Sequence, residues 1–184
     1  MEEIKLTETE KIELLRIARQ IVAGQFQGGS RAISTDMDGL QREGGAFVTL
    51  HKKGELRGCI GNFFSDKPLY KTVAEMALSA AFKDPRFSPL RENELDELDF
   101  EISVLSPLRQ IEDAGEIEVG RHGIFITKGA KRGVLLPQVA REYGWDRETF
   151  LEHTCMKAGL PSDEWRHGAK IEVFSAQVFG EKAS

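Results

Sequence analysis

The chain of 184 residues carries 30 acidic side chains against 25 Lys and Arg, a net charge of −5 that opposes the broad basic face needed for non-specific nucleic-acid binding. Its length suits one sizeable core or two small subdomains that share an interface, so we treat residues 1–184 as one folding unit. No apolar run approaches the roughly 20 residues that cross a bilayer, and the first residues lack a secretory signal, so a cytoplasmic protein without membrane contact is expected.

The first predicted element is a helix. Thr7-Glu8-Thr9-Glu10 fits a capping box, and apolar residues then recur at helical spacing up to Gly24, which is suited to end the helix. The stretch 25–45 is rich in Gly and Asp and has little periodicity. It predicts a long loop with one turn of helix at most.

Two antiparallel strands are expected next, at 46–51 and 56–60, because Gly54 between them permits the positive φ of a tight hairpin. Pro68 then opens a run of apolar residues at helical spacing, which predicts a second long helix. This helix must end before Pro85, since proline lacks an amide proton and biases its predecessor toward extended geometry.

The C-terminal half mixes short strands and helices. β-rich runs lie at 100–105, 123–127 and 134–136. Helices are expected at 139–143 and, capped by Asp146, up to Ala158. The last strand, 171–179, has apolar residues of both parities, which favours a central place in the sheet or a bulge. Helices interspersed with close hairpins indicate an α+β fold with an antiparallel sheet flanked by helices.

Cys59 is the principal candidate for chemistry. Alternate side chains of a strand share a face, so Arg57 is expected beside Cys59, with about 6.6 Å between Cα atoms and with Leu56 on the opposite face. A guanidinium there favours a thiolate in a partly dry site. Gly58 and Gly61 lack bulk and admit a ligand or another backbone. The alternative is that Cys59 is a small buried hydrophobe and that the glycines serve a bend.

Glu101 and His122 are further candidates. Glu101 lies on the polar side of its strand and is suited to act as an acid or base, or to orient a histidine, if that face lines a cleft. The alternative is the wet face of a half-buried strand. His122 lies among small neighbours that leave its ring accessible as a base, and the alternative is a turn residue without a role. Cys155 has no adjacent cation and is expected to be buried and inert.

Cofactor chemistry has little support in the sequence. The four histidines are dispersed, without HxH, HExxH or carboxylate-rich spacing, so no metal site is expected. Cys59 and Cys155 form no CxxC pair, and no glycine-rich segment, including Gly28-Gly29-Ser30, matches a nucleotide fingerprint. The cofactor is therefore unknown. The basic cluster at 128–132 is expected to be a solvated hairpin turn.

A rigid loop is expected directly after the second long helix. Pro85 fixes φ, and Phe87 is expected to anchor the loop in the core. Arg86 is expected to pair with Asp84, and the alternative is that it binds an anionic ligand.

Several motifs, in this order, closely resemble the AMMECR family, also known as AmmeMemoRadiSam system protein A. They are Gly45-Ala46-Phe47-Val48-Thr49-Leu50, Leu56-Arg57-Gly58-Cys59-Ile60-Gly61, Ala81-Phe82-Lys83-Asp84-Pro85-Arg86-Phe87, Glu101-Ile102-Ser103-Val104-Leu105-Ser106-Pro107, Gly133-Val134-Leu135-Leu136-Pro137-Gln138-Val139-Ala140 and Gly144-Trp145-Asp146. The resemblance covers residues 4 to 181.

This resemblance implies an α+β fold of two connected subdomains with a cleft near Arg57-Gly58-Cys59, and it implies no particular reaction. Members of the family are commonly encoded beside a Memo-like protein and a radical S-adenosylmethionine protein, which are therefore the expected partners. The chain lacks the three-cysteine motif of a radical enzyme. Two functions remain open: an enzyme or enzyme-like ligand-binding protein centred on Cys59, Arg57, Glu101 and His122, or a non-catalytic interaction module.

Overall fold

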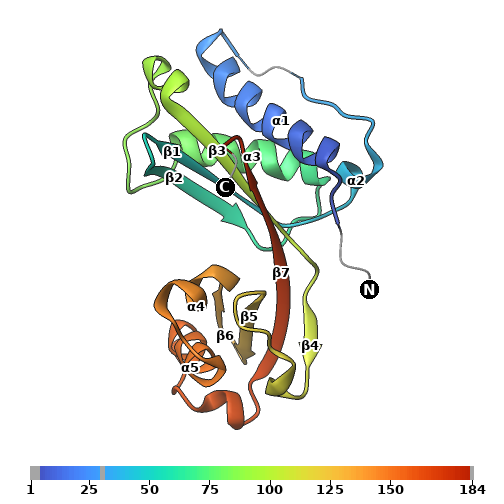
Figure 1. Cartoon of the computed structure of the whole chain (residues 1–184), viewed down its shortest axis with the longest axis vertical. Coiled ribbons are helices and arrows are strands. Elements are labelled where there is room, and N and C mark those ends of the chain that lie inside the picture. Colours follow the sequence, from blue (N-terminus) through green and yellow to red (C-terminus); the bar gives the residue numbers. More distant parts are fainter. Residues whose placement is uncertain (1–4, 30–31, 183–184) are drawn as a thin grey trace. The chain divides into compact units, whose positions relative to one another are not determined.

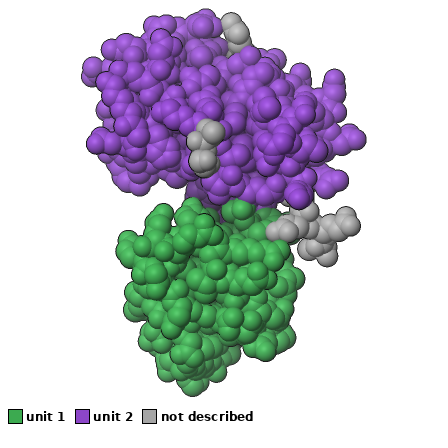
Figure 2. All heavy atoms as spheres, in the orientation of Figure 1, with its two compact units in different colours: residues 1, 106–176 green, residues 2–105, 177–184 purple. Residues whose placement is uncertain are grey.

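The structure is a computed structural model that describes residues 5–29 and 32–182. The chain divides into two compact units (Figure 2). Among the described residues, unit 1 comprises 106–176, and unit 2 comprises the residues up to 105 together with 177–182. Strands and helices occur in both units, so the predicted α+β class is confirmed (Figure 1).

Unit 2 contains the two long helices that the sequence predicts. Helix α1 (Glu8–Phe26) begins with the expected capping box, in which Thr7 and Glu10 bind each other's backbone N–H groups. Helix α3 (Leu69–Phe82) ends before Pro85, as expected. The loop between α1 and the first strand holds one helical turn, α2 (Asp38–Gln41), while residues 30–31 of that loop, and so Ser30, lie outside the described residues.

The sheet of unit 2 is antiparallel and buries one face under these helices. Its strands are β1 (Ala46–Lys52), β2 (Glu55–Asn62) and β3 (Leu98–Leu105), preceded by the short helix η1 (Glu92–Glu97). Strand β1 lies between β2 and β3. Helix α3 packs on β1 and β2, and α1 packs on α3 and β3. Alternate residues of β1 and β3, among them Val48, Leu50, Phe100 and Ile102, are fully buried in this core.

A β-bulge decides which residues of β2 face the helices. Lys53 and Gly54 form the hairpin turn with positive φ at both positions, and Lys52 opposes Glu55. The register shifts between Leu50 and His51, so that Leu50 opposes Gly58 and His51 opposes Leu56. The expected alternation holds for 58–61, where Cys59 and Gly61 share a face, but the expectation for Leu56 was wrong. Leu56 pairs on the same face of the sheet as Cys59, because the bulge adds a residue to β2.

Unit 1 is a smaller α+β body with its own core. Its strands are β4 (Arg109–Ile111), β5 (His122–Lys128), β6 (Lys131–Leu135) and part of β7 (Lys170–Gly180), and its helices are η2 (Ala114–Glu116), α4 (Pro137–Tyr143), α5 (Arg147–Lys157) and η3 (Glu164–Arg166). Phe150 and Leu151 of α5 are fully buried against Ile124 and Ile126 of β5. Asp146 caps α5 as expected, and its side chain accepts a hydrogen bond from the N–H of Thr149.

The position of the final strand explains why apolar residues occur on both of its faces. Strand β7 lies between β3 and β5 in the sheet order, so its predicted central place is confirmed. Its residues up to Ala176 belong to unit 1 and those from Gln177 belong to unit 2, where Phe179 packs against the helices' core. Strand β4, only three residues long, was not anticipated, because so short a run carries no measurable periodicity. None of the helices in the described part of the chain is long and apolar enough to span a membrane.

Candidate functional site

The bulge turns Cys59 away from the helices. A Cβ atom on Gly58 would lie 2.2 Å from the carbonyl oxygen of Ala80 in α3, so the Gly58 side of the strand lies directly against the helix backbone. Cys59, the next residue, points to the opposite face of the sheet and is partly exposed. Glycine at position 58 therefore permits the close approach of a backbone, one of the two reasons that the sequence suggested.

Cys59, Thr49 and Glu101 form one row across three strands. Thr49 of β1 opposes Cys59 of β2 on one side and Glu101 of β3 on the other. The Thr49 hydroxyl lies 3.2 Å from the Cys59 sulfur, within hydrogen-bond distance. Next to this row, the ring of Phe47 lies over Gly61, where a Cβ would come within 2.1 Å of the ring. The open face of the sheet thus offers a thiol, a hydroxyl and a carboxylate beside an aromatic ring.

The backbone of Cys59 is fixed by the loop that follows α3. Strand β2 is an edge strand, and the Asp84 carboxylate accepts a hydrogen bond from the Cys59 N–H (2.9 Å) at that edge. Arg86 donates to the Cys59 carbonyl oxygen at 3.3 Å and binds Asp84 through Nε and Nη2, at 3.0 and 2.8 Å. The pair takes the place of a neighbouring strand and satisfies backbone groups that an edge leaves open.

Asp84 is a buried charge, with its side chain 1% exposed against 55% for Arg86. Hydrogen bonds from Arg86 hold the pKa of Asp84 well below its usual range, and those from the backbone N–H groups of Cys59 and Arg86 act in the same direction against the opposing effect of burial. The predicted pairing of Asp84 with Arg86 is thus confirmed. The expectation for Phe87 was wrong, because its ring is only half-buried and lies beneath the Arg86 guanidinium.

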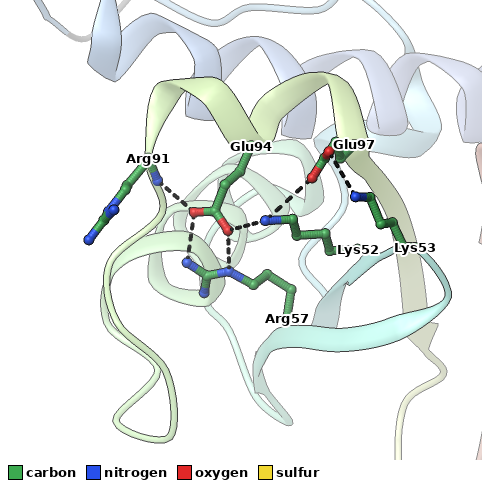
Figure 3. Close-up of polar contacts among 6 residues, drawn as sticks. All are labelled: Lys52, Lys53, Arg57, Arg91, Glu94 and Glu97. Atoms are coloured by element: carbon green, nitrogen blue, oxygen red, sulfur yellow. Dashed lines mark hydrogen bonds and ion pairs between the residues drawn. The ribbon is translucent and has the colours of Figure 1, made fainter.

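Arg57 is held by a carboxylate that the sequence did not single out. Its Nε and Nη2 donate to the two oxygens of Glu94 in η1, both at 3.0 Å, and Lys52 donates to the same carboxylate (Figure 3). Glu97 links Lys52 to Lys53 in the same network. The pKa of Glu94 is lowered to about 2, chiefly by the hydrogen bonds from Arg57. This network fastens the bulged part of β2 to η1.

The four predicted site residues are only partly brought together. Arg57, Cys59 and Glu101 belong to unit 2, whereas His122 belongs to unit 1. Nδ1 of His122 accepts a hydrogen bond from the N–H of Glu118 at 3.1 Å, which fixes the ring against the preceding turn. Within the described residues no hydrogen bond joins Arg57 to Cys59, and the guanidinium that contacts Cys59 is that of Arg86, which donates to the Cys59 carbonyl oxygen. The roles of these four residues stay predictions.

A cavity of about 270 Å³ in unit 2 adjoins the row at Glu101. It is lined by His51, Gly54, Asp99, Phe100, Glu101, Gly180, Glu181 and Lys182. Of the four candidates, only Glu101 lines it. Within the described residues no group of three or more His, Cys, Asp or Glu is placed to hold a metal ion. Cys155 is fully buried on α5, and burial raises the pKa of its thiol.

Sequence reasoning missed Thr49, Glu94 and the cavity. The hairpin was the available signal for Thr49. If the pairing of Lys52 with Glu55 continued without a bulge, Thr49 would oppose Gly58. The bulge shifts the register by one residue, so that Thr49 opposes Cys59 instead. The partner of Arg57 is 37 residues away in the chain, and no local pattern points to it.

Comparison with known proteins gives one family. The family model described as AMMECR1 matches residues 15–179. Protein MK0488 of Methanopyrus kandleri is 44% identical over 189 residues, covering 97% of this chain and 91% of that protein. Protein MJ0810 of Methanocaldococcus jannaschii is 42% identical, covering 96% and 92%. The crystal structure of the uncharacterized protein PH0010 from Pyrococcus horikoshii is 39% identical with a TM-score of 0.79, covering 92% of this chain and 90% of that one.

Proposed function

Because the chain belongs to the AMMECR1 family, and Cys59 of its Leu56-Arg57-Gly58-Cys59-Ile60-Gly61 motif points away from the helices, we propose that it acts through Cys59 as an enzyme or enzyme-like ligand-binding protein. The observation that supports this best is the contact of the Cys59 sulfur with the Thr49 hydroxyl at 3.2 Å on a partly exposed face. A structural cysteine is usually buried among apolar side chains, as Cys155 is.

The surroundings of Cys59 suit a thiol that reacts or binds. A hydroxyl that donates to sulfur stabilises a thiolate, and the thiolate is the nucleophilic form. Asp84 and Arg86 hold the backbone N–H and carbonyl groups of Cys59, which fixes the strand from which the sulfur projects. Arg86 also places a positive charge beside Cys59, since its guanidinium donates to the carbonyl oxygen of that residue. Phe47 supplies an apolar wall for a substrate on the same face.

We expect Cys59 to react with iodoacetamide in the folded protein while the buried Cys155 does not. Removing the hydroxyl with Thr49→Val is expected to slow alkylation about fivefold, since a hydrogen bond to a charged group contributes about 1.5 kcal/mol or less at a partly exposed site. The rates are measured by mass spectrometry of the intact protein, with Cys59→Ser as the blank. Unreactive Cys59 in the wild type contradicts the proposal.

The two arginines are distinguished in the same assay. We expect Arg86→Ala to slow alkylation more than Arg57→Ala. The guanidinium of Arg57 already donates through Nε and Nη2 to the two oxygens of Glu94, which neutralises its charge. A larger loss in Arg57→Ala than in Arg86→Ala would restore Arg57 as the direct neighbour of the thiolate.

The alternative function is a non-catalytic interaction module. It is favoured by the neighbour of the thiol, since Thr49 is a hydroxyl and not the imidazole or carboxylate that takes a proton from a nucleophile. The expected partners are a Memo-like protein and a radical S-adenosylmethionine protein. Affinity capture of both by the wild type, unchanged in Cys59→Ser, supports the module. Saturable small-molecule binding lost in Cys59→Ser supports the enzyme.

A further inference from the structure

The cavity of unit 2 is built from the ends of strands and from a turn. His51 and Gly54 come from the β1–β2 hairpin, Asp99 and Glu101 from β3, and Gly180 from the end of β7. A Cβ on Gly54 would meet no atom within 4 Å, so this position leaves open space. The volume of about 270 Å³ lies just below the 300 to 1,000 Å³ that is typical of small-molecule sites, which limits any ligand of this cavity to a small one.

The charges of the cavity are balanced except at one group. Asp99 pairs with Lys182, and Glu181 binds Arg19 through both oxygens, at 2.6 and 2.7 Å. The carboxylate of Glu101 has no hydrogen bond or ion pair within residues 5–29 and 32–182, and neither has the ring of His51. A carboxylate that lines a cavity without a partner is stabilised by a cationic ligand whose N–H groups donate hydrogen bonds to it.

We propose that this cavity binds a small organic ammonium compound, with its N–H groups donating to the Glu101 carboxylate and to the acceptor nitrogen of His51. With Asp99 paired to Lys182 and Glu181 paired to Arg19, the lining charge left uncompensated is the carboxylate of Glu101, which disfavours an anionic ligand. A bare metal ion fits less well, because no three-ligand group exists among the described residues.

The position of Glu101 connects this cavity to the thiol. Cys59 and Glu101 both oppose Thr49, so they lie two strand spacings apart, about 10 Å. In this respect the inference rests on the proposed function: a substrate held by its ammonium group at Glu101 has its reacting carbon about 10 Å away, at the sulfur of Cys59. Binding of the ammonium group itself does not depend on Cys59.

The binding site is tested with n-butylammonium as the probe and with n-butanol and butanoate as matched uncharged and anionic compounds. In a titration of the ¹⁵N-labelled full chain followed by NMR, n-butylammonium is expected to shift the amides of Gly54, Glu101 and Gly180 saturably, and the other two compounds are not. Glu101→Gln is expected to weaken binding at least tenfold. Glu142→Gln, an exposed change of the same kind in unit 1, is expected to leave it unchanged.

Equal shifts with n-butanol, or equal affinity in Glu101→Gln, overturn the inference. The comparison of the three compounds on the wild type needs no variant, so it decides the matter even where Glu101→Gln folds poorly.

The link to Cys59 is tested with two chloroacetamides, one carrying an aminohexyl chain and one carrying a hexyl chain. The sulfur displaces chloride: a C–S bond forms, the C–Cl bond breaks, chloride leaves with the electron pair, and the thiol proton goes to solvent. The aminohexyl compound is expected to react at least fivefold faster, and Glu101→Gln is expected to remove this difference. Equal rates for the two compounds overturn the link alone. A Cys59 that reacts with neither overturns the proposed function, while NMR binding of n-butylammonium still stands.

Discussion

Asp84→Asn is expected to lower the free energy of unfolding by about 3 kcal/mol and to loosen the strand at Cys59. Asp84 accepts four hydrogen bonds, from the N–H of Cys59 and from the N–H, Nε and Nη2 of Arg86. An asparagine of the same shape has no charge, and its amide group turns a donor toward these donors. The loss is measured by urea unfolding, and the loosening by faster hydrogen exchange of the Cys59 amide.

Two controls separate the buried acceptor from its partner. Arg86→Ala is expected to cost less, about 1 kcal/mol, because that side chain is largely exposed and Asp84 keeps the backbone N–H of Cys59. Asp66→Asn removes an exposed carboxylate between β2 and α3 and is expected to change little. If Asp84→Asn unfolds at the wild-type urea concentration, the loop does not hold the edge of β2.

Glu94→Gln is expected to cost up to about 3 kcal/mol at pH 7 and progressively less in acid. The pKa of Glu94 is lowered from 4.5 to about 2, first by hydrogen bonds from Arg57. A depressed pKa in the folded state means that the ionised network stabilises the protein above pH 4.5, and that this contribution is lost as the pH falls from 4.5 toward 2. The side chains of Arg57 and Glu94 are 11% and 14% exposed, so solvent screens the pair little.

The measurement is urea unfolding of wild type and Glu94→Gln between pH 7 and pH 3. The difference between the two proteins is expected to shrink as the pH falls. Glu92→Gln on the same short helix, exposed and without a carboxylate contact to Arg57, serves as the control and is expected to follow the wild type at every pH. A difference that stays constant from pH 7 to pH 3 would mean that the charge of Glu94 does not stabilise the bulged strand.

The secondary structure followed largely from local signals. Helix ends could be predicted because their signals act on a few neighbouring residues. These signals are the capping box at Thr7, the Asp146 cap and the prolines at 68 and 85. The hairpin around Gly54 could be predicted from the sequence for the same reason. Strand β4 was not predicted, because it pairs with β7 about 60 positions away and its three residues are too few to show a periodic pattern.

The candidate site could be predicted from the sequence only in part. The sequence singles out the Cys59 segment, because a cysteine between glycines in a strand is unusual and because the motif resembles a family. It also anticipates the Asp84–Arg86 pair, whose members are two positions apart. It places Arg57 beside Cys59 on strict alternation, and the bulge with the distant Glu94 gives Arg57 another neighbour.

By itself the sequence determined the class of fold, the order of its main elements, the family and the residue on which chemistry is proposed to centre, since all of these depend on periodicity, caps, turns and motifs within short windows. Only the tertiary structure decided which way Cys59 points, that Thr49 touches it, that Asp84 holds its backbone and that Glu101 borders a cavity. These depend on strand register and on contacts between distant segments. A shift of one residue in register exchanges the two faces of a strand, and no local preference is strong enough to fix it.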